Sequence, residues 1–235
     1  MRAVILAGGL GMRLRPYTTV LPKPLVPVGE RPILEIILRQ LAAAGVERAD
    51  LCVSHLGELI QVYFSQAAKL PEQLELRFHW EDEPLGTAGA LRVVPDLDGT
   101  FIAMNGDVLT TLDYRALVDY HHAQDALLTV AMHSRRVDID LGVIESDDGL
   151  ITGYREKPTL HYDVSMGVYV YDAAALRYLP ESGPCQFPDL VLRLLDAGER
   201  VAAFRNDADW YDVGTFEEYE RAVQDISRRA DAFGV

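Results

Sequence analysis

Short apolar runs alternate with segments of helical periodicity along most of the chain. The first run, Ala3–Ala7, shows no alternation of apolar and polar positions, which predicts a strand buried on both faces. Apolar runs of similar length predict further strands at Leu51–Ser54, Leu76–His79, Phe101–Met104 and Leu127–Met132. Strands that alternate with helices in this way are typical of an α/β sheet.

Five longer segments carry a helical pattern. Between Arg31 and Ala44 the apolar residues recur at a spacing that places them on one helix face, and Gly45 is expected to end this helix. The other four helices predicted from periodicity are Glu58–Ala68, Tyr114–Ala123, Phe187–Ala197 and Phe216–Arg229. In addition, a helix is expected to begin near Thr87, and the last few residues of the chain are expected to be frayed.

The pattern changes between Leu141 and Tyr171, where shorter strand-like pieces are separated by polar turns. We expect this region to form a smaller mixed sub-sheet beside the half of the domain that the earlier strands build. A chain of 235 residues is long enough for one sizeable core, so a single domain is expected.

Composition narrows the range of partners. Hydrophobic residues make up 49% and charged residues 25%, which is ordinary for a soluble globular protein, and no apolar stretch approaches the roughly 20 residues that cross a bilayer. The N-terminus leads directly into the first strand, which leaves no room for a signal peptide, so a cytoplasmic location is the default. Neither Cys52, expected as a buried small hydrophobe, nor Cys185 falls at metal-ligand spacing.

Charge argues against polyanionic partners. With Lys+Arg 22 against Asp+Glu 36, the net charge of −14 disfavours nucleic acid and anionic membranes. Phosphorylated small molecules would then have to be held by local basic residues and a metal ion.

The N-terminal sequence LAGGLGMRLRP has the composition of a phosphate-binding loop. Its three glycines follow the first strand, and backbone N–H groups in such a turn converge into an anion-binding concavity. Arg13 and Lys23 add fixed positive charge, and the prolines around Lys23 stiffen the loop that presents it. A dinucleotide fingerprint needs a third glycine where Leu14 stands, and a P-loop needs Gly-Lys-Ser/Thr, so neither motif describes this segment.

Three later segments carry groups suited to nucleotides and metals. Leu85–Leu91 (LGTAGAL) brings two glycines to an expected helix start, where backbone groups can approach a flat ring. Asp107 follows a predicted strand and so lies at the edge where α/β sheets bind ligands, which makes it a candidate Mg²⁺ ligand. Asp212 is a possible second carboxylate, just before Thr215, the expected cap of the last helix.

These segments, together with LPKPLVPV (residues 21–28) and EKP (residues 156–158), resemble the sugar-1-phosphate nucleotidylyltransferases, also called nucleotide-sugar pyrophosphorylases. The pattern is nearest to the mannose-1-phosphate and heptose-1-phosphate guanylyltransferases, and the resemblance covers nearly the whole chain. It implies a three-layer α/β fold of the Rossmann-like nucleotide-diphospho-sugar transferase kind with a mixed central sheet. It also implies one catalytic domain over residues 1–235, a sugar-binding sub-region at about 141–171 and no C-terminal β-helix domain, so that any homo-oligomer forms through the catalytic domain itself.

The resemblance further implies roles for individual residues. Arg13 would stabilise the leaving β and γ phosphates, Lys23 the α-phosphate and Lys157 the incoming phosphate. Arg13, Lys23 and Asp107 are the implied catalytic residues, and Asp107 with Asp212 the implied Mg²⁺ ligands. The implied sugar-phosphate site contains Gly142, Glu156, Lys157, Ser165 and Gly167. The implied nucleotide site contains Leu6, Ala7, Gly8, Gly9, Gly11, Met12, Arg13, Lys23, Glu83, Pro84, Gly86, Thr87, Ala88, Asn105 and Gly106.

The implied reaction joins a nucleoside triphosphate, with GTP preferred, to a mannose- or heptose-like sugar 1-phosphate and releases pyrophosphate. UTP, CTP, dTTP or ATP with another sugar 1-phosphate is the alternative. Ser165 replaces an asparagine of the family pattern, a departure that bears on the sugar more than on the reaction.

Two other classes of function are distinguishable in principle. A sugar transferase that consumes an NDP-sugar would need an Asp-x-Asp metal-binding motif. At that place this chain has a single carboxylate, Asp107. A non-catalytic regulatory subunit would show erosion among the charged site residues Arg13, Lys23, Asp107 and Asp212, and all four are present.

Overall fold

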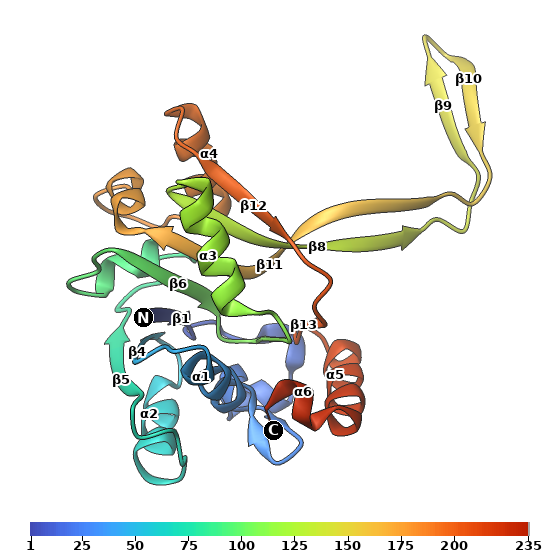
Figure 1. Ribbon diagram of the computed structural model, residues 1–235. Coiled ribbons are helices and arrows are strands. Elements are labelled where there is room, and N and C mark those ends of the chain that lie inside the picture. Colours follow the sequence, from blue (N-terminus) through green and yellow to red (C-terminus); the bar gives the residue numbers. More distant parts are fainter. Residues whose placement is uncertain (235) are drawn as a thin grey trace.

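The computed structural model describes residues 1–234 and contains a seven-stranded mixed sheet with helices on both faces (Figure 1). The four strands at one side run parallel, whereas β11 runs antiparallel to both of its neighbours and β12 is parallel to β8. The expected mixed sheet is therefore confirmed. In spatial order its strands are β12 (Val201–Arg205), β8 (Leu128–Asp138), β11 (Thr159–Asp172), β6 (Thr100–Asn105), β1 (Arg2–Leu6), β4 (Arg48–Val53) and β5 (Glu75–Trp80).

All five longer helices predicted from periodicity are present, with ends within two residues of those expected. The first begins at Ile33 because Pro32 and the residue before it are extended and form β3 (Arg31–Pro32), which pairs with β2 (Pro27–Val28). None of the helices in the described part of the chain is both long and apolar enough to cross a membrane. The five helices are α1 (Ile33–Ala43), α2 (Gly57–Gln66), α3 (Tyr114–Gln124), α4 (Phe187–Asp196) and α5 (Phe216–Arg228).

Several short elements are not predicted by the hydrophobic pattern of the sequence. β7 (Val108–Thr110) and β13 (Trp210–Asp212) pair only with each other, and three-residue elements are too short to show a period. The helix expected near Thr87 is instead the 3₁₀ helix η4 (Gly89–Val93), which starts later because Gly86 turns the chain at φ +79°. The other 3₁₀ helices are η1 (Met12–Leu14), η2 (Tyr17–Thr19), η3 (Lys23–Leu25) and η5 (Ala173–Tyr178).

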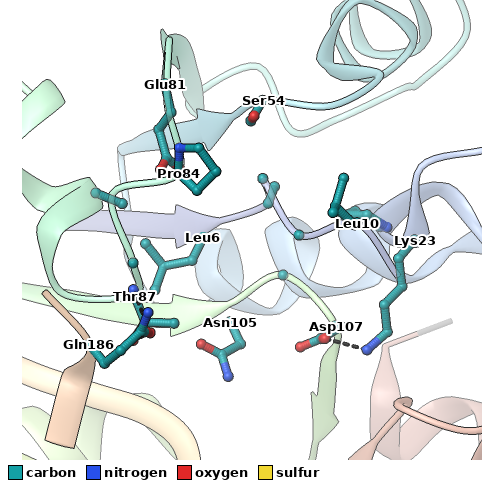
Figure 2. A pocket seen from close by; sticks show the side chains of 17 residues that line it. Leu6, Leu10, Lys23, Ser54, Glu81, Pro84, Thr87, Asn105, Asp107 and Gln186 are labelled. Carbon is teal, nitrogen blue, oxygen red and sulfur yellow. Dashed lines mark hydrogen bonds and ion pairs between the residues drawn. The ribbon is translucent and has the colours of Figure 1, made fainter. Parts of the chain in front are cut away.

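The order of the strands creates a switch point between β1 and β6. After β1 the chain builds β4 and β5 on one side, and then crosses back to place β6 on the other side. Leu6 and Asn105 are register partners at the ends of these two strands, and the Gly106 N–H donates to the Leu6 carbonyl at 2.9 Å. Ligands of open α/β sheets bind at such a point, outside the carboxyl ends of the strands. Figure 2 shows Leu6 and Asn105 beside a cavity at this place.

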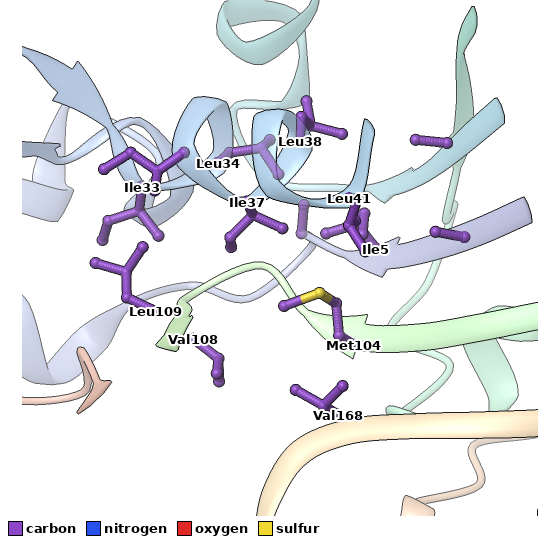
Figure 3. Packing of buried hydrophobic residues seen from close by; sticks show 14 of the residues in the cluster. Ile5, Ile33, Leu34, Ile37, Leu38, Leu41, Met104, Val108, Leu109 and Val168 are labelled. Atoms are coloured by element: carbon purple, nitrogen blue, oxygen red, sulfur yellow. The ribbon is translucent and has the colours of Figure 1, made fainter. Parts of the chain in front are cut away.

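Side chains of β1 are buried on both faces of the sheet, as its unbroken apolar run predicts. Ile5 belongs to a cluster that includes the apolar faces of α1, α3 and α5, whereas Val4 belongs to a second cluster with η4 and α4. Figure 3 shows Ile37 and Leu41 of α1 over the side of the sheet that carries Ile5. The two clusters confirm the three-layer α/β architecture.

The region expected to form a sub-sheet of short strands beside the body has a different structure. β8 and β11 continue past the sheet as one antiparallel ribbon, with register intact from Met132↔Ser165 to Asp138↔Thr159. A hairpin of β9 (Val143–Asp147) and β10 (Leu150–Arg155) follows, and the whole extension projects away from the body (Figure 1). Beyond the sheet the two strands pair with each other, which satisfies their backbone groups. We call residues 133–164 the arm.

The C-terminal residues are ordered in a short helix, contrary to the expected fraying. Helix α6 (Ala230–Phe233) places the Phe233 side chain, which is fully buried, in the larger apolar cluster. The Gln40 side-chain amide donates to the Phe233 carbonyl at 3.2 Å. Burial of one aromatic side chain thus docks this terminus, a contact that a local sequence pattern does not reveal. Of the residues expected to be frayed, Val235 lies outside the described part.

Replacement of Phe233 by alanine should lower the free energy of unfolding by about 3 kcal/mol, since it removes a large buried side chain and leaves a cavity. Equilibrium unfolding in urea measures the change. Asp231→Ala, on the exposed side of the same short helix, should change stability by less than about 0.5 kcal/mol. Equal stability of the two variants would show that α6 does not contribute to the core.

Candidate active site

A cavity of about 380 Å³ lies at the switch point between β1 and β6 (Figure 2). This volume suits a small molecule. Segments that are far apart in the sequence contribute to its wall. The residues that line it are Leu6, Ala7, Gly8, Gly9, Leu10, Lys23, Pro24, Ser54, Glu81, Pro84, Gly86, Thr87, Ala90, Asn105, Gly106, Asp107 and Gln186.

Two glycines of the first loop allow neighbouring segments to approach it closely. A Cβ at Gly8 would lie 3.0 Å from a carboxylate oxygen of Glu81, so the loop after β1 lies directly against the opposite wall of the cavity. At Gly11, φ is +59°, and a Cβ would lie 2.9 Å from the Thr18 methyl group. The Thr18 hydroxyl also donates to the Gly11 carbonyl at 2.7 Å. These contacts fold the loop back toward the segment that carries Lys23.

The Lys23 side chain is almost completely buried and forms an ion pair with Asp107 at one end of the cavity (Figure 2). The pair joins η3 to the loop that follows β6, residues 84 positions apart. Asp107 uses one carboxylate oxygen in this pair. Its other oxygen, Oδ1, is buried and has no hydrogen-bond partner among the described residues. A buried acceptor that is left unpaired costs free energy, so this atom is suited to a bound cation or donor.

A second carboxylate lies beside this one. Strand β13 pairs with β7 so that Asp212 is opposite Val108, and the Val213 N–H donates to the Asp107 carbonyl at 3.2 Å. Burial raises the pKa of Asp212, and the negative charge of Asp107 raises it further, whereas the nearby charge of Lys23 lowers it. The topology thus brings together the two carboxylates that the sequence places more than a hundred residues apart.

The donor set fits a hard divalent cation. Mg²⁺ prefers oxygen ligands and typically takes one or two carboxylates together with water and phosphate oxygens. Asp107 and Asp212 are two such carboxylates, and the remaining positions would be taken by water and phosphate oxygens. The unpaired Asp107 oxygen and the raised pKa of Asp212 are both relieved by positive charge at this place.

Arg13 lies beside the carboxylates but outside the cavity lining. Its guanidinium packs against Gly214, where a Cβ would lie 3.2 Å from one terminal nitrogen. Its positive charge also lowers the pKa of Asp212. Thr215, directly after Gly214, caps α5 as expected: its hydroxyl accepts from the Glu218 N–H at 3.3 Å. The cap fixes the start of α5, which directly follows Gly214 and Thr215.

The opposite end of the cavity is built from two segments about a hundred residues apart. Gly86 adopts φ +79°, and a Cβ there would lie 2.6 Å from the Cys185 carbonyl oxygen. The Cys185 N–H donates to the Leu85 carbonyl at 2.8 Å, and the Phe187 N–H donates to the Thr87 hydroxyl at 2.8 Å. These bonds join the LGTAGAL segment to the start of α4 and bring the Gln186 side chain into the wall.

Glu81 contributes a partly buried carboxylate to the same end. The Leu85 N–H donates a hydrogen bond to Oε2 of Glu81 at 3.1 Å. Burial raises the pKa of Glu81, and the hydrogen bond from Leu85 partly offsets the increase. A carboxylate in this position presents two acceptor oxygens to a ligand.

The structure brings most of the predicted nucleotide-binding residues together and leaves others outside the lining. Gly11, Met12, Arg13 and Glu83 lie outside it, and Ala88 is fully buried behind it. The predicted residues in the lining are Leu6, Ala7, Gly8, Gly9, Lys23, Pro84, Gly86, Thr87, Asn105 and Gly106.

The predicted sugar-phosphate residues divide into two groups. Gly167, at φ +73°, lies against the cavity, since a Cβ there would be 2.7 Å from the Asn105 amide nitrogen. Ser165 accepts from the Gly167 N–H at 3.3 Å. The other three, Gly142, Glu156 and Lys157, belong to the arm and lie outside the cavity lining.

Sequence reasoning missed several residues of the lining, including Ser54, Glu81 and Gln186. Ser54 directly follows β4, so the rule that ligands bind at carboxyl ends of strands could have found it. Glu81 directly follows β5 in the same way. Nothing in the local sequence connects Gln186 with Thr87, because their contact depends on the tertiary fold.

Fold and site define a class of α/β protein with a ligand cavity at the switch point of its sheet. Comparison with known proteins agrees: a family model described as "Nucleotidyl transferase" matches residues 2–229. The chain belongs to the nucleotidyl transferase family, which confirms the resemblance found in its motifs.

Three relatives are named as sugar-1-phosphate nucleotidylyltransferases. The chain is 30% identical to a UTP–glucose-1-phosphate uridylyltransferase of Synechocystis sp., over 97% of this chain and 64% of that protein. It is 32% identical to a mannose-1-phosphate guanyltransferase of Candida albicans, over 93% of this chain and 62% of that protein. It thus spans less than two thirds of the length of these two relatives. A D-glycero-alpha-D-manno-heptose 1-phosphate guanylyltransferase of Aneurinibacillus thermoaerophilus is 28% identical, over 96% of this chain and 98% of its own length.

Solved structures support the same fold. HddC from Yersinia pseudotuberculosis, complexed with GMP-PN, superposes with a TM-score of 0.71 at 26% identity and covers 96% of this chain and 99% of that one. A putative glucose-1-phosphate thymidylyltransferase from Bacillus anthracis superposes with a TM-score of 0.75 at 25% identity, over 95% of this chain and 94% of that one.

Magnesium should stabilise the folded protein, because it neutralises two crowded carboxylates. At a hundredfold excess over its Kd, a ligand that binds only the native state adds about 2.7 kcal/mol. We expect MgCl₂ to raise the Tm of the wild type, and NaCl at equal ionic strength to leave it nearly unchanged.

The Asp212→Asn variant tests whether Asp212 is one of the Mg²⁺ ligands. Because the folded pKa of Asp212 is raised, its ionised form costs stability without metal, and that cost grows as pH rises from the unfolded pKa through the folded one. Asp212→Asn should therefore have a higher Tm than the wild type at neutral pH without Mg²⁺ and show no rise when Mg²⁺ is added. An undiminished Mg²⁺ effect in this variant would exclude Asp212 as a ligand.

Proposed function

We propose that this protein is a guanylyltransferase that transfers GMP from GTP to a mannose- or heptose-like sugar 1-phosphate and releases pyrophosphate. Residues 1–235 form its catalytic domain. Glu81 carries the preference for GTP, since it places a carboxylate at the end of the cavity remote from the Lys23–Asp107 pair. Relatives named as guanylyltransferases of mannose 1-phosphate and heptose 1-phosphate support the choice of sugar.

The hydrogen-bonding pattern of guanine explains this role of Glu81. Guanine presents two adjacent donors, N1–H and the exocyclic amino group, which two carboxylate oxygens can accept together. Uracil and thymine offer one N–H flanked by two carbonyl acceptors, and adenine offers an acceptor at N1. A carboxylate therefore attracts guanine and repels the acceptor groups of the other bases.

The arrangement of the charged groups supports the following reaction. An oxygen of the sugar phosphate attacks the α-phosphorus of GTP in line, and the bond between the α-phosphorus and the bridging oxygen breaks. Lys23 neutralises charge on the α-phosphate, and Arg13 stabilises the departing pyrophosphate. Mg²⁺ held by Asp107 and Asp212 would supply further positive charge to the phosphates. The protein contributes positioning and charge neutralisation and needs no covalent intermediate.

Pyrophosphate release from a panel of nucleoside triphosphates and sugar 1-phosphates tests this proposal. GTP should give the highest kcat/KM, with mannose 1-phosphate or a heptose 1-phosphate as acceptor. No release with any pair would refute catalysis and favour a regulatory nucleotide-sugar-binding protein. A higher kcat/KM with UTP or dTTP than with GTP would refute the role of Glu81.

The Glu81→Gln variant should lose about 100-fold in kcat/KM for GTP, because a hydrogen bond to a charged group contributes about 1.5–3 kcal/mol and the amide presents only one acceptor. Its ratio of GTP to UTP turnover should fall as well. Asp82→Asn, one residue further and exposed outside the lining, should behave as wild type. An unchanged GTP preference in Glu81→Gln would contradict the assignment.

The Gly214→Ala variant tests the position of Arg13. Its added methyl group would push the guanidinium aside, so kcat/KM should fall about 10-fold, whereas stability should change little because the displaced atoms end a flexible side chain. The same change in an Arg13→Ala background should have almost no further effect on kcat/KM. Full additivity of the two changes would mean that Gly214 acts independently of Arg13.

A further inference from the structure

Gln186 places a side-chain amide in the wall of the cavity (Figure 2). Its backbone is tied to the first turn of α4, because the Gln186 N–H donates to the Asp189 carboxylate at 2.9 Å. The neighbouring Cys185 is tied to the opposite segment, since its N–H donates to the Leu85 carbonyl at 2.8 Å. The amide therefore extends from a backbone that is fixed on both sides.

The amide group of Gln186 is oriented by Thr87. The backbone N–H and the hydroxyl of Thr87 both donate to Oε1 of Gln186, each at 3.3 Å. A backbone N–H can only donate, so the atom that faces it is the amide oxygen, and the amide nitrogen lies on the other side. The Thr87 hydroxyl is itself held in place, because it accepts from the Phe187 N–H at 2.8 Å. Two donors thus occupy the two lone pairs of Oε1.

The amide nitrogen Nε2 of Gln186 has two N–H groups, and within the described residues its amide is bonded only through the oxygen. Nε2 lies against Gly86, where a Cβ would be 2.9 Å away, so glycine at this position leaves room for the amide. Gly86 also lines the cavity. An oriented amide donor at this place is suited to an acceptor atom of a bound ligand.

Gln186 and Glu81 belong to the same end of the cavity. Leu85 connects them: its N–H donates to Oε2 of Glu81 at 3.1 Å, and its carbonyl accepts from the residue before Gln186. Figure 2 shows both side chains at the end remote from the buried ion pair. This end of the cavity therefore presents two acceptor oxygens from one side chain and an oriented donor from another.

We infer that the Gln186 amide nitrogen donates a hydrogen bond to O6 of guanine, which makes Gln186 a second residue that determines nucleotide specificity. One edge of guanine carries the amino group at C2, then N1–H, then the carbonyl oxygen O6, which is two donors followed by an acceptor. Glu81 accepts from the two donors, and Gln186 donates to the acceptor. The inference deepens the proposed function and rests on its assignment of GTP.

Glu81 and Gln186 would exclude different bases. The carboxylate disfavours uracil and thymine, which lack two adjacent donors. The amide disfavours adenine and 2,6-diaminopurine, because both carry an amino group at C6, where guanine carries O6. Two donors would then face each other and neither would have an acceptor, an arrangement that a hydrogen-bonding site rejects strongly.

Equilibrium binding of GTP analogues tests this contact without requiring turnover or knowledge of the sugar. In 6-thio-GTP a sulfur atom, a weaker acceptor, replaces O6, and both donors of the edge remain. ITP keeps O6 and lacks the 2-amino group. Isothermal titration calorimetry in the presence of Mg²⁺ should show that the wild type binds either analogue about 10-fold more weakly than GTP.

The Gln186→Met variant removes the amide and keeps the length of the side chain. It should bind GTP about 10-fold more weakly than the wild type and bind 6-thio-GTP as well as GTP, while it still prefers GTP to ITP. Glu81→Gln should show the reverse pattern, with a reduced preference for GTP over ITP and an unchanged preference over 6-thio-GTP. Gln61→Met, at an exposed position on α2 outside the lining, should bind all three nucleotides as the wild type does.

A preference for GTP over 6-thio-GTP that persists in Gln186→Met would overturn the inference. Loss of a preference for GTP over 7-deaza-GTP in its place would show that the amide contacts N7, and would overturn the assignment of O6.

The Gln186→Glu variant keeps an acceptor for Thr87 and replaces the donor by a second oxygen. GTP binding should weaken about 100-fold, because a carboxylate repels O6, and the triphosphate of 2,6-diaminopurine riboside should bind better relative to GTP than it does in the wild type. Gln61→Glu adds the same charge outside the lining and should leave both affinities unchanged. Equal affinity for GTP in the two glutamate variants would contradict the contact.

These measurements distinguish the Gln186 contact from the proposed reaction. A wild type that shows the expected binding pattern but releases no pyrophosphate with any acceptor would refute catalysis and still support the contact. Pyrophosphate release from GTP, with a 6-thio-GTP preference that Gln186→Met does not alter, would overturn the contact alone. Tighter binding of UTP or dTTP than of GTP by the wild type would overturn both.

Discussion

The close approach of β1 and β6 is the constraint on which the site depends. The Gly106 N–H bonds to the Leu6 carbonyl, and a Cβ at position 106 would lie only 3.0 Å from that oxygen. Glycine at this position lets the loop after β6 begin directly beside the loop after β1. The glycine-rich loop and Asp107 therefore face the same cavity, although about a hundred residues separate them.

The proposed binding of phosphates by a strongly acidic chain depends on the local arrangement of its charges. Lys23 is buried beside Asp107, so its ammonium group is fixed by a partner before any phosphate arrives. Asp107 keeps one oxygen that is unpaired within the described residues and the pKa of Asp212 is raised, so further positive charge at this place is favourable, and a phosphate favours positive charge as well. A divalent cation would satisfy both needs, and it would reconcile the proposed binding of polyphosphates with a net charge of −14.

The local sequence was sufficient to predict the features that depend on neighbouring residues. The helix over Arg31–Ala44 and the buried strand over Ala3–Ala7 followed from periodicity, and the glycine-rich loop followed from its motif. Features that depend on tertiary contacts were missed or misjudged. The arm extends instead of folding beside the body, and Phe233 is buried instead of frayed. Apolar patterns identify the residues that favour burial, but they do not identify the surface against which those residues pack.

At the end of the cavity that contains Gly86 and Gln186, two segments are coupled through backbone hydrogen bonds on both sides of Cys185. These bonds hold the wall in place whatever side chain occupies position 186, because they involve the main chain. Under the proposed function, a substitution at Gln186 could therefore alter the nucleotide preference while the backbone of this wall keeps its position. This separation offers an evolutionary route by which a single scaffold could give rise to enzymes with different nucleotide preferences.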